Sequence, residues 1–222
     1  MPRKPETPGT CTYCGEVITR RAVDKHLAVC QKRQAVLQAS NQADETLWRL
    51  QIQPTYNKSF WLVLEMRGSA SLNQLDKYLR SIWLECCGHL SEYTPSASSH
   101  FKIPKSRLAN DTFAAGLTLH HMYDFGSTSH TDIKVLDKAL GRPATKNPIS
   151  LLARNQLPNE TCSECEQKAG WLCMECLNEF GDLTFLCNEH YDEHLHEEGV
   201  VALVNSPRLG MCGYSGPAEP PY

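Results

Sequence analysis

The sequence predicts an α+β fold, in which a central sheet-plus-helix domain is flanked by two small cysteine- and histidine-rich modules. Three observations lead to this fold class. Cysteines cluster near both ends of the 222-residue chain, a strand-like segment precedes an amphipathic helix, and a hairpin pattern follows. The 11 cysteines are about 5% of the chain, below the level that marks a disulfide scaffold.

No secretory leader or membrane-spanning segment is predicted. Met1 is followed by Pro, Arg and Lys without an apolar stretch. The longest apolar runs, such as 61–64 and 200–204, fall far short of the ~20 residues that a spanning helix needs. We therefore expect a soluble, cytoplasmic protein, in which clustered cysteines are typical of metal ligands rather than of disulfides.

Four segments are expected along the chain. A cysteine–histidine finger with a basic tail occupies residues 1–40, of which the first ten are expected to be disordered. A linker, rich in Gln, Ala, Ser and Asn at its start, covers residues 41–58. The α+β domain covers residues 59–160, and the second cysteine- and histidine-rich module covers residues 161–222.

The central domain is expected to begin with a strand and a helix. Phe60 to Arg67 is predicted to be a strand, because aromatic and β-branched residues precede Gly68. A helix is expected to begin after Ser71, a suitable N-cap residue, and to end near Gly88. The apolar residues of this helix recur at three- and four-residue spacing and are Leu72, Leu75, Leu79, Ile82 and Trp83.

A hairpin is predicted in the second half of the domain. Residues 118–125 and 133–136 have strand-like composition, and a Gly-Ser-Thr turn at 126–128 lies between them. Beyond the hairpin, we expect a loop-rich return that is interrupted by Pro143, Pro148 and Pro158.

The N-terminal segment CTYCGEVITRRAVDKHLAVC, residues 11–30, has the spacing of a metal site. It contains a Cys-x2-Cys pair, an interval of eleven residues, and a His-x3-Cys pair on one helix face. Zinc prefers four thiolate or imidazole ligands in a tetrahedron, and so short a segment needs a metal to fold. The predicted ligands are Cys11, Cys14, His26 and Cys30.

This segment resembles the ββα zinc finger, with a cysteine in place of the last histidine. Ile18 and Val23 match the two apolar core positions of that family. The resemblance implies that Lys25 stands at one of the base-reading positions. The candidate nucleic-acid contacts are Arg20, Arg21 and Lys25.

The two ends of the chain carry opposite charge. Residues 1–40 contain 7 Lys and Arg against 3 Asp and Glu, whereas residues 161–222 contain 2 against 11. The basic end suits a phosphate backbone, and the acidic end would repel one. The acidic end therefore favours a basic or polar protein partner.

The C-terminal segment from Cys162 reads Cys-x2-Cys-x7-Cys-x2-Cys-x10-Cys-x2-His-x3-His-x-His. Eight such ligands in about 35 residues predict two zinc ions. The interval of ten residues leaves the pairing open, and Cys212 is an alternative ligand for either ion. Closed sites with four protein ligands are typical of structural rather than catalytic zinc.

This pattern resembles the B-box and other cross-brace zinc modules, in which ligand pairs alternate between two ions. The resemblance implies two ligand sets. They are Cys162, Cys165, Cys187 and His190 for one ion, and Cys173, Cys176, His194 and His196 for the other. Together with the finger, we expect about three zinc ions per chain, from twelve ligands at four per site.

Two cysteines in the middle of the chain, Cys86 and Cys87, are left over and are expected to end the helix, with at least one packed in the core. A rival interpretation is an enzyme of unknown reaction in the central domain. Its candidate groups are Cys87, His89, His120, Asp124 and His130. No residue is assigned as catalytic, and an enzyme is not the favoured interpretation.

Four segments, LRSIWLECCGHLSEY, YDFGSTS, LLARNQLP and LVNSPRLGMCGYSGP, together resemble the plasmid pRiA4b ORF-3-like family. The resemblance runs from about Phe60 to Pro217 and implies an α+β domain of the kind found on plasmids, mobile elements and bacterial chromosomes. It implies no established activity.

These observations predict a zinc-binding adaptor or regulatory protein of bacterial or mobile-element type. We expect it to bind a protein partner, and nucleic acid is a candidate partner of the N-terminal finger. The alternatives are the enzyme described above and a structural or assembly protein whose zinc ions serve only the fold.

Overall fold

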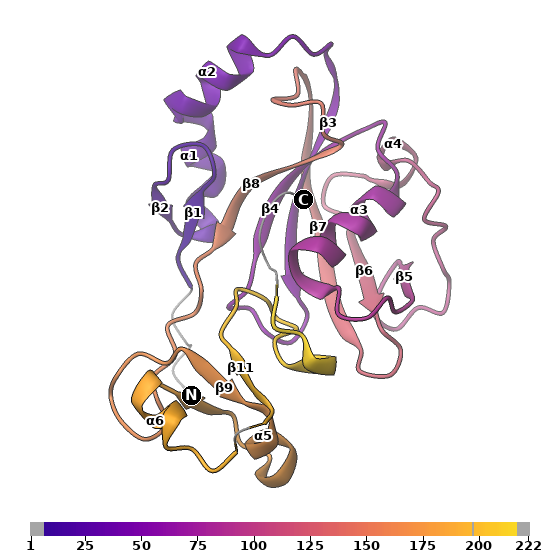
Figure 1. The fold of residues 1–222 in the computed structure, drawn as a ribbon. Coiled ribbons are helices and arrows are strands. Elements are labelled where there is room, and N and C mark those ends of the chain that lie inside the picture. Colours follow the sequence, from indigo (N-terminus) through magenta and orange to yellow (C-terminus); the bar gives the residue numbers. More distant parts are fainter. Residues whose placement is uncertain (1–6, 197, 217–222) are drawn as a thin grey trace. The chain divides into compact units, whose positions relative to one another are not determined.

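The computed structural model describes residues 7–196 and 198–216 and confirms the α+β class (Figure 1). The chain divides into two compact units. One contains the residues up to Arg80 together with Leu90–Gln156, and the other contains Ser81–His89 together with the residues from Leu157 onward. The short stretch Ser81–His89 belongs to the second unit, which the predicted segments did not include.

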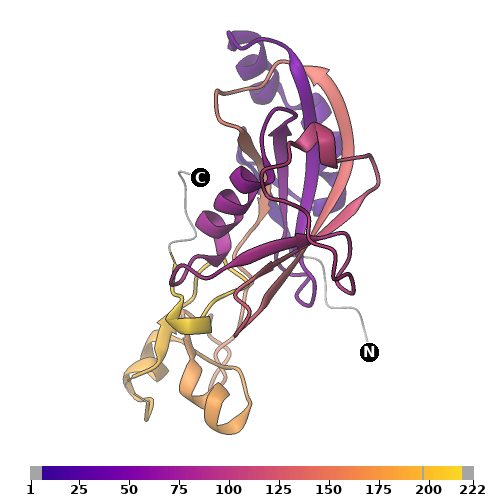
Figure 2. The ribbon, with the colours of Figure 1, turned by 90° about the vertical axis from the view of Figure 1, so that its right-hand side faces the viewer.

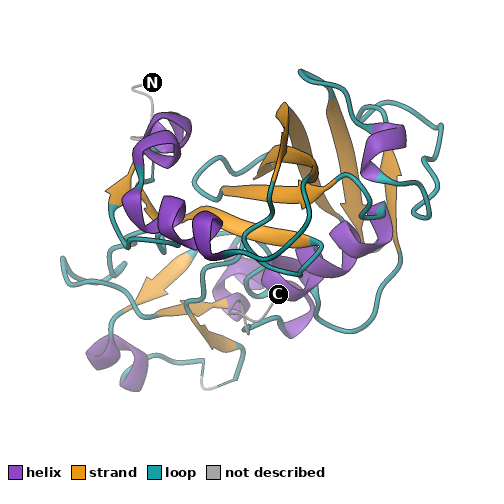
Figure 3. Ribbon diagram, turned by 90° about the horizontal axis from the view of Figure 1, so that it is seen from above, coloured by secondary structure: helices purple, strands orange, loops and turns teal. Residues whose placement is uncertain are grey.

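The first unit is built on an eight-stranded antiparallel sheet with the strand order β2-β1-β8-β4-β3-β7-β6-β5 (Figures 1 and 3). Strands from the two ends of this unit therefore meet in one sheet, with β1 beside β8. The strands are β1 (Gly9–Cys11), β2 (Val17–Ile18), β3 (Glu45–Pro54), β4 (Leu62–Arg67), β5 (Ser91–Thr94), β6 (Thr118–Tyr123), β7 (Ser129–Gly141) and β8 (Ile149–Asn155).

Strand β3 corrects the expectation of a linker at residues 41–58. It pairs with β4 on one side and β7 on the other, and Leu50 and Ile52 are fully buried between them. The alternation of these residues with Arg49, Gln51 and Gln53 is the period-two pattern of a strand. This strand was not predicted, because the polar residues before and within the segment gave it the composition of a linker.

The strand and helix predicted at the start of the central domain are confirmed. Strand β4 matches the first, and α3 (Leu72–Leu79) matches the second, lying against one face of the sheet (Figure 2). Ser71 forms a capping box with Gln74, in which each side chain accepts from the other's backbone N–H. The helical path continues as the π-helical segment Arg80–Leu84, so it ends four residues before Gly88.

The predicted hairpin is also confirmed, as β6 and β7. The loop-rich return is corrected, because β8 lies between Pro148 and Pro158 and buries Leu152 and Ala153. The prolines delimit this strand rather than interrupt it, as expected where proline lacks the N–H that a strand interior needs. Two further elements, β5 and α4 (Ala109–Thr112), lie between helix α3 and the hairpin and were not predicted.

The N-terminal finger has the ββα order. Strands β1 and β2 are followed by the 3-10 turn η1 (Arg20–Ala22) and by α1 (Val23–Val29). Cys30 has an extended backbone conformation that separates α1 from α2 (Gln31–Ala39). Because β1 is a paired strand, the expectation of disorder in residues 1–10 is wrong for residues 9 and 10; residues 1–6 lie outside the described part of the chain.

The second unit contains a three-stranded antiparallel sheet with the order β10-β9-β11. Its elements are β9 (Trp171–Cys173), α5 (Met174–Phe180), β10 (Thr184–Leu186), α6 (Asn188–Asp192), β11 (Val200–Ala202) and the 3-10 turn η3 (Met211–Gly213). Within the described residues, no helix has the length and apolar character needed to cross a membrane.

Candidate metal centres

Among the residues that the structure describes, four groups of Cys and His side chains each bring their ligand atoms within 4.8 Å of one another. Three groups consist of the twelve predicted ligands, in the same sets of four that the spacing and the cross-brace resemblance suggested. The fourth group was not predicted and consists of Cys86, Cys87, His89 and Cys212. Together the four groups contain all 11 cysteines of the chain, and all of these are free thiols.

The finger group is held between the two short strands and α1. Cys11 ends β1, and a backbone hydrogen bond from Gly15 to its carbonyl closes the turn that carries Cys14. The Sγ of Cys14 lies 3.3 Å from Nε2 of His26, the histidine on α1. On the other side of the ring, Nδ1 of His26 lies 3.4 Å from a carboxylate oxygen of Glu16. Such a carboxylate orients a ligating imidazole and fixes which nitrogen faces the metal.

The two thiols of the finger knuckle differ in acidity. Burial raises the pKa of Cys11 to about 11, and the neighbouring Cys14 thiol adds to this rise. The pKa of Cys14 is lowered instead, first by the backbone N–H of Glu16. A bound cation stabilises the thiolate form and so favours loss of the proton from a buried thiol of this kind, which makes the group better suited to a metal than to an empty pair of thiols.

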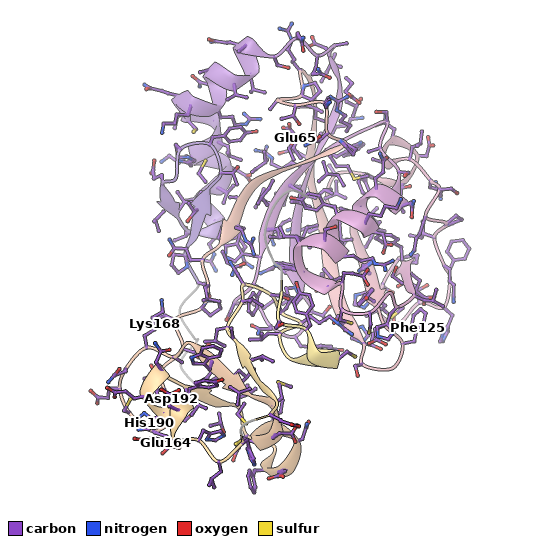
Figure 4. All side chains as sticks on the ribbon, viewed as in Figure 1. Glu65, Phe125, Glu164, Lys168, His190 and Asp192 are labelled. Carbon is purple, nitrogen blue, oxygen red and sulfur yellow. The ribbon has the colours of Figure 1, made fainter. Side chains whose placement is uncertain are left out.

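The first group of the C-terminal module joins a knuckle to the start of α6. Nδ1 of His190 lies 3.2 Å from Sγ of Cys187 and 3.6 Å from Sγ of Cys162, and the Sγ atoms of Cys165 and Cys187 are 3.9 Å apart. Burial raises the pKa of Cys162, but backbone N–H groups, that of Cys187 first, outweigh it and bring the pKa to about 6. This thiol is therefore poised to be a thiolate at neutral pH. Figure 4 labels Glu164, His190 and Asp192 in this module.

The second group of the module lies between β9, α5 and the segment that precedes β11. Nδ1 of His196 lies 3.3 Å from Sγ of Cys173 and 3.4 Å from Sγ of Cys176, while Nε2 of His194 lies 3.4 Å from Sγ of Cys176. Nε2 of His196 lies 3.4 Å from a carboxylate oxygen of Glu179. This contact repeats the arrangement of Glu16 and His26 in the finger.

These three groups fit zinc. With Zn–S bonds of about 2.3 Å and Zn–N bonds of about 2.0 Å, the ligand atoms of a tetrahedral site are about 3.3–3.8 Å apart. The close pairs within the three groups are 3.2–3.9 Å apart, around this range. Each group supplies four protein ligands, so a tetrahedral ion would have no free position for a reacting water, and its contribution would be to stabilise the fold.

Cys212 belongs to neither C-terminal quartet. The structure places it with Cys86, Cys87 and His89 in the second unit. The expectation that Cys86 and Cys87 end the helix with one of them in the core is also corrected. The helical path ends at Leu84, and of the two cysteines Cys86 is half-buried and Cys87 is exposed.

The five side chains named as candidates for an enzyme have separate sets of contacts in the structure. His120 and His130, on β6 and β7, lie with Nε2 and Nδ1 2.9 Å apart, and Nδ1 of His120 lies 3.2 Å from Asp132 rather than from Asp124. Asp124 has a left-handed backbone and accepts a hydrogen bond from the N–H of Gly126, which is a turn contact. In the second unit, Cys87 and His89 belong to the fourth Cys/His group.

The histidine next to His120 has a different set of partners. Nε2 of His121 donates to Asp76 of α3 at 2.8 Å, and both side chains are buried. Asp76 also accepts from Ser91 at 2.6 Å and from Lys105 at 3.1 Å. As alternation along a strand predicts, neighbouring histidines on β6 point to opposite faces and do not share a ligand.

The basic residues proposed for nucleic-acid contact lie at the start of the finger helix. Arg20 and Arg21 belong to η1 and Lys25 to α1, and the side chains of Arg21 and Lys25 are exposed. The acidic residue on this helix, Asp24, forms an ion pair with Arg49 of β3 at 3.3 Å.

Comparison with known proteins adds little to this description. No protein-family model matches the chain, and a search of curated proteins found no match. Among solved structures, the chain is similar to that of a protein of unknown function, MM3350, from Methanosarcina mazei Go1. The sequence identity is 11% and the TM-score 0.41, over 50% of this chain and 68% of that one. A likeness at this level supports no conclusion about fold or function.

Proposed function

We propose that the chain is a zinc-stabilised adaptor whose basic finger contacts nucleic acid and whose acidic C-terminal module contacts a protein. The observation that carries this proposal is the set of three Cys/His quartets, each with four ligand atoms within 4.8 Å. Closed quartets of this kind support a binding surface rather than a reaction. The resemblance to pRiA4b ORF-3-like proteins and the cytoplasmic location remain predictions.

The finger supplies the nucleic-acid side of the proposal. Its exposed Arg21 and Lys25 lie on η1 and α1, the part of a ββα finger that faces the major groove. A single finger spans only about three base pairs, so most of its affinity would come from phosphate contacts.

The module supplies the protein side. Its exposed acidic residues include Glu164, Glu166, Glu189, Asp192, Glu193 and Glu198. Phe180, Leu183 and Leu195 are also exposed, and Leu195 retains 94% of its accessible surface. Acidic and apolar side chains together disfavour a phosphate backbone and suit a protein with basic and apolar residues.

The test of the nucleic-acid half is duplex DNA and RNA binding, measured by fluorescence anisotropy over a range of salt concentrations. Replacement of Arg20, Arg21 and Lys25 by Gln is expected to weaken binding. The slope of log K against log salt should decrease by about 0.9 for each DNA phosphate that the variant no longer neutralises. The matched control is Lys134→Gln, an exposed lysine on β7.

Wild-type binding that is absent or independent of salt would contradict the nucleic-acid half, as would an equal effect of the Lys134 control. The metal half is tested by elemental analysis of the zinc-loaded protein. At least about three zinc ions per chain are expected from the three quartets, and a value near one would contradict the architecture.

A further inference from the structure

Once the three quartets are assigned, three of the 11 cysteines are left over, and the fold brings these three together. Cys86 and Cys87 follow the π-helical segment Arg80–Leu84, whereas Cys212 lies in the turn η3. His89 completes the group, and the four ligand atoms lie within 4.8 Å of one another. We propose that Cys86, Cys87, His89 and Cys212 form a fourth metal site, for a zinc-type divalent cation.

The separations within this group are short enough for a shared ion. The Sγ atoms of Cys86 and Cys87 are 3.4 Å apart, and Sγ of Cys87 lies 2.8 Å from Nε2 of His89. Around a tetrahedral zinc ion, two thiolates lie about 3.8 Å apart and a thiolate and an imidazole about 3.5 Å apart, so both pairs would separate slightly on binding. A sulfur–sulfur separation of 3.4 Å is far longer than the ~2.05 Å of a disulfide, so the pair is a dithiol.

The backbone around these ligands repeats a feature of the finger. The chain contains three Cys–Gly steps, and in all three the glycine has a left-handed backbone: Gly15 with φ +78°, Gly88 with φ +77° and Gly213 with φ +69°. The first follows the finger ligand Cys14, and the other two follow Cys87 and Cys212. A glycine of this conformation lets the chain reverse directly after a ligand at no steric cost.

Cys212 itself adopts a conformation that non-glycine residues rarely use, with φ +50°. Strain of this kind persists only where the surrounding structure holds the residue, and it concentrates at functional sites. In the fourth group, this conformation turns the Cys212 thiol towards two cysteines that are distant in the sequence.

A buried guanidinium supplies the charge that such a site needs. Arg208 is fully buried and donates from one NH2 group to Sγ of Cys86 at 3.2 Å and to Sγ of Cys212 at 3.5 Å. Three thiolates and one divalent cation carry a net charge of −1, which a guanidinium neutralises. Ser206 anchors this segment, since its Oγ donates to the carbonyl of Trp83 at 2.6 Å and accepts from the N–H of Arg208 at 3.0 Å.

The fourth site differs from the other three in exposure. Each of the other groups contains two buried cysteines, whereas Cys87 and Cys212 are exposed and Cys86 and His89 are half-buried. An ion held here would link Ser81–His89 to the C-terminal segment within the second unit. Because water and chelators reach it directly, it would be the first of the four ions to leave.

The test is elemental analysis of the full zinc-loaded chain. The wild type is expected to hold about four zinc ions, and a variant with Cys86→Ser, Cys87→Ser and Cys212→Ser about three. Glu85→Gln is the matched control, since Glu85 lies beside the group and accepts a hydrogen bond from Gly88 without belonging to the group. Equal zinc content in the wild type and the triple variant would overturn the proposal.

Two single variants keep the proposal testable if the triple variant fails to fold. His89→Cys exchanges one zinc ligand for another and is expected to retain about four ions, whereas His89→Ala is expected to lose one. Retention of all four ions by His89→Ala would overturn the site. Cobalt substitution adds a spectroscopic readout, because His89→Cys is expected to increase the thiolate-to-cobalt absorption and Glu85→Gln to leave it unchanged.

These outcomes are separate from those of the proposed function. Loss of the fourth ion alone leaves the three quartets and the salt-dependent nucleic-acid binding intact. Failure of the proposed function would appear as fewer than three zinc ions in the wild type, or as absent nucleic-acid binding.

Discussion

The N-terminal finger and the C-terminal module use the same ligand chemistry, but they differ in what supports it. In the finger, the buried residues Cys11, Val23 and Leu27 share one apolar cluster with Trp61, which directly precedes β4, and with Leu152 of β8. In the module, the corresponding buried cluster consists of Cys173, Cys176 and Leu186, with Trp171, Tyr191 and Val200 partly buried around it. The module's core is therefore made largely of its own metal ligands.

This difference shows how one kind of site serves two structural purposes. Strand β1 pairs with β8, and Oγ1 of Thr12 donates to the carbonyls of Leu151 and Leu152, so the finger is part of a larger sheet. A metal ion there adds to an existing core. In the module, two of the three buried residues of this cluster are ligands, so we expect its fold to depend on metal more than the finger does.

The largest expected effect is that of metal removal, which should affect the finger and the module to different degrees. Chelation should abolish hydrogen-exchange protection in β9, β10 and β11, because structural zinc supplies on the order of 10 kcal/mol to modules of this size. Strands β3, β4 and β7 should remain protected, and β1 should retain part of its protection. Hydrogen exchange followed by mass spectrometry measures all of these segments in one experiment.

Zinc-loaded protein without chelator provides the reference for each segment. Undiminished protection of β9 and β11 after metal removal would show that the module does not depend on its ligands for a core, and the contrast with the finger would disappear.

The next effect tests whether the sheet supports the finger. Trp61 is fully buried, and its Nε1 donates to the carbonyl of Thr7 at 3.0 Å. Its ring also occupies the space that a side chain on Gly9 would need. Trp61→Ala should cost the first unit about 3–5 kcal/mol in the free energy of unfolding and should make the finger lose its metal faster on chelation.

The matched control for this change is Trp171→Ala, which removes a tryptophan that stacks on Tyr191 in the module, with ring centroids 4.4 Å apart. It should accelerate metal loss from the module and leave the finger unchanged. Denaturant unfolding and thiol-release kinetics measure both variants. Equal effects on the finger from the two variants would show that it draws no support from the sheet.

The smallest expected effect concerns the pH dependence of stability, and it distinguishes the contribution of the large sheet from that of the metal ligands. Burial lowers the pKa of His121, although its hydrogen bond to Asp76 acts in the opposite direction. Its pKa in the folded protein therefore lies below the ~6.5 of an unfolded chain. As the pH falls below about 6.5, the unfolded state takes up this proton more readily than the folded state does. Stability of the first unit should then decrease below about pH 6.5, by at most about 1.4 kcal/mol per pH unit.

His121→Gln should remove this part of the pH dependence, measured as the unfolding free energy between about pH 6.5 and pH 5. Protonation of the metal ligands affects the wild type and the variant alike and so cancels in the comparison. Asp76 contributes at lower pH. Burial raises its pKa, but the bonds from His121 and Ser91 outweigh this and lower it, so its stabilising effect is lost only below about pH 4. Identical slopes for the two proteins would exclude His121 as the source.

Local patterns in the sequence predict much of this molecule. Strand β4, the capped helix α3 and the β6–β7 hairpin all follow from short-range spacing and turn residues. The finger quartet follows from its spacing. In the C-terminal module, spacing predicts the eight ligands but leaves their pairing open, and the two sets come from the resemblance to cross-brace modules. Strand β3 was not predicted, since its alternating Leu50 and Ile52 stand in a segment whose composition is typical of a linker.

The fourth Cys/His group could not be predicted by spacing, because half of the strands of the large sheet and all three strands of the module separate Cys212 from Cys87 along the chain. Only the fold brings them together. A weaker signal was present in the sequence: Cys87 and Cys212 are each followed by glycine, as is Cys14 in the finger. That signal carries weight only once the backbone of these glycines is known to be left-handed.

The pairing of β1 with β8 has a consequence for the order in which the protein is made. The finger's ligands lie within residues 11–30, so its metal site is complete well before residue 151 is synthesised. The carbonyl that accepts from Thr12 belongs to Leu151, 139 residues later, which is about 7–28 s of synthesis at 5–20 residues per second. During that interval, the edge of β1 that later pairs with β8 has no partner and can pair with a strand of another nascent chain. The first metal site to be completed thus borders the last sheet edge to be closed, and prompt metal binding would limit mispairing there.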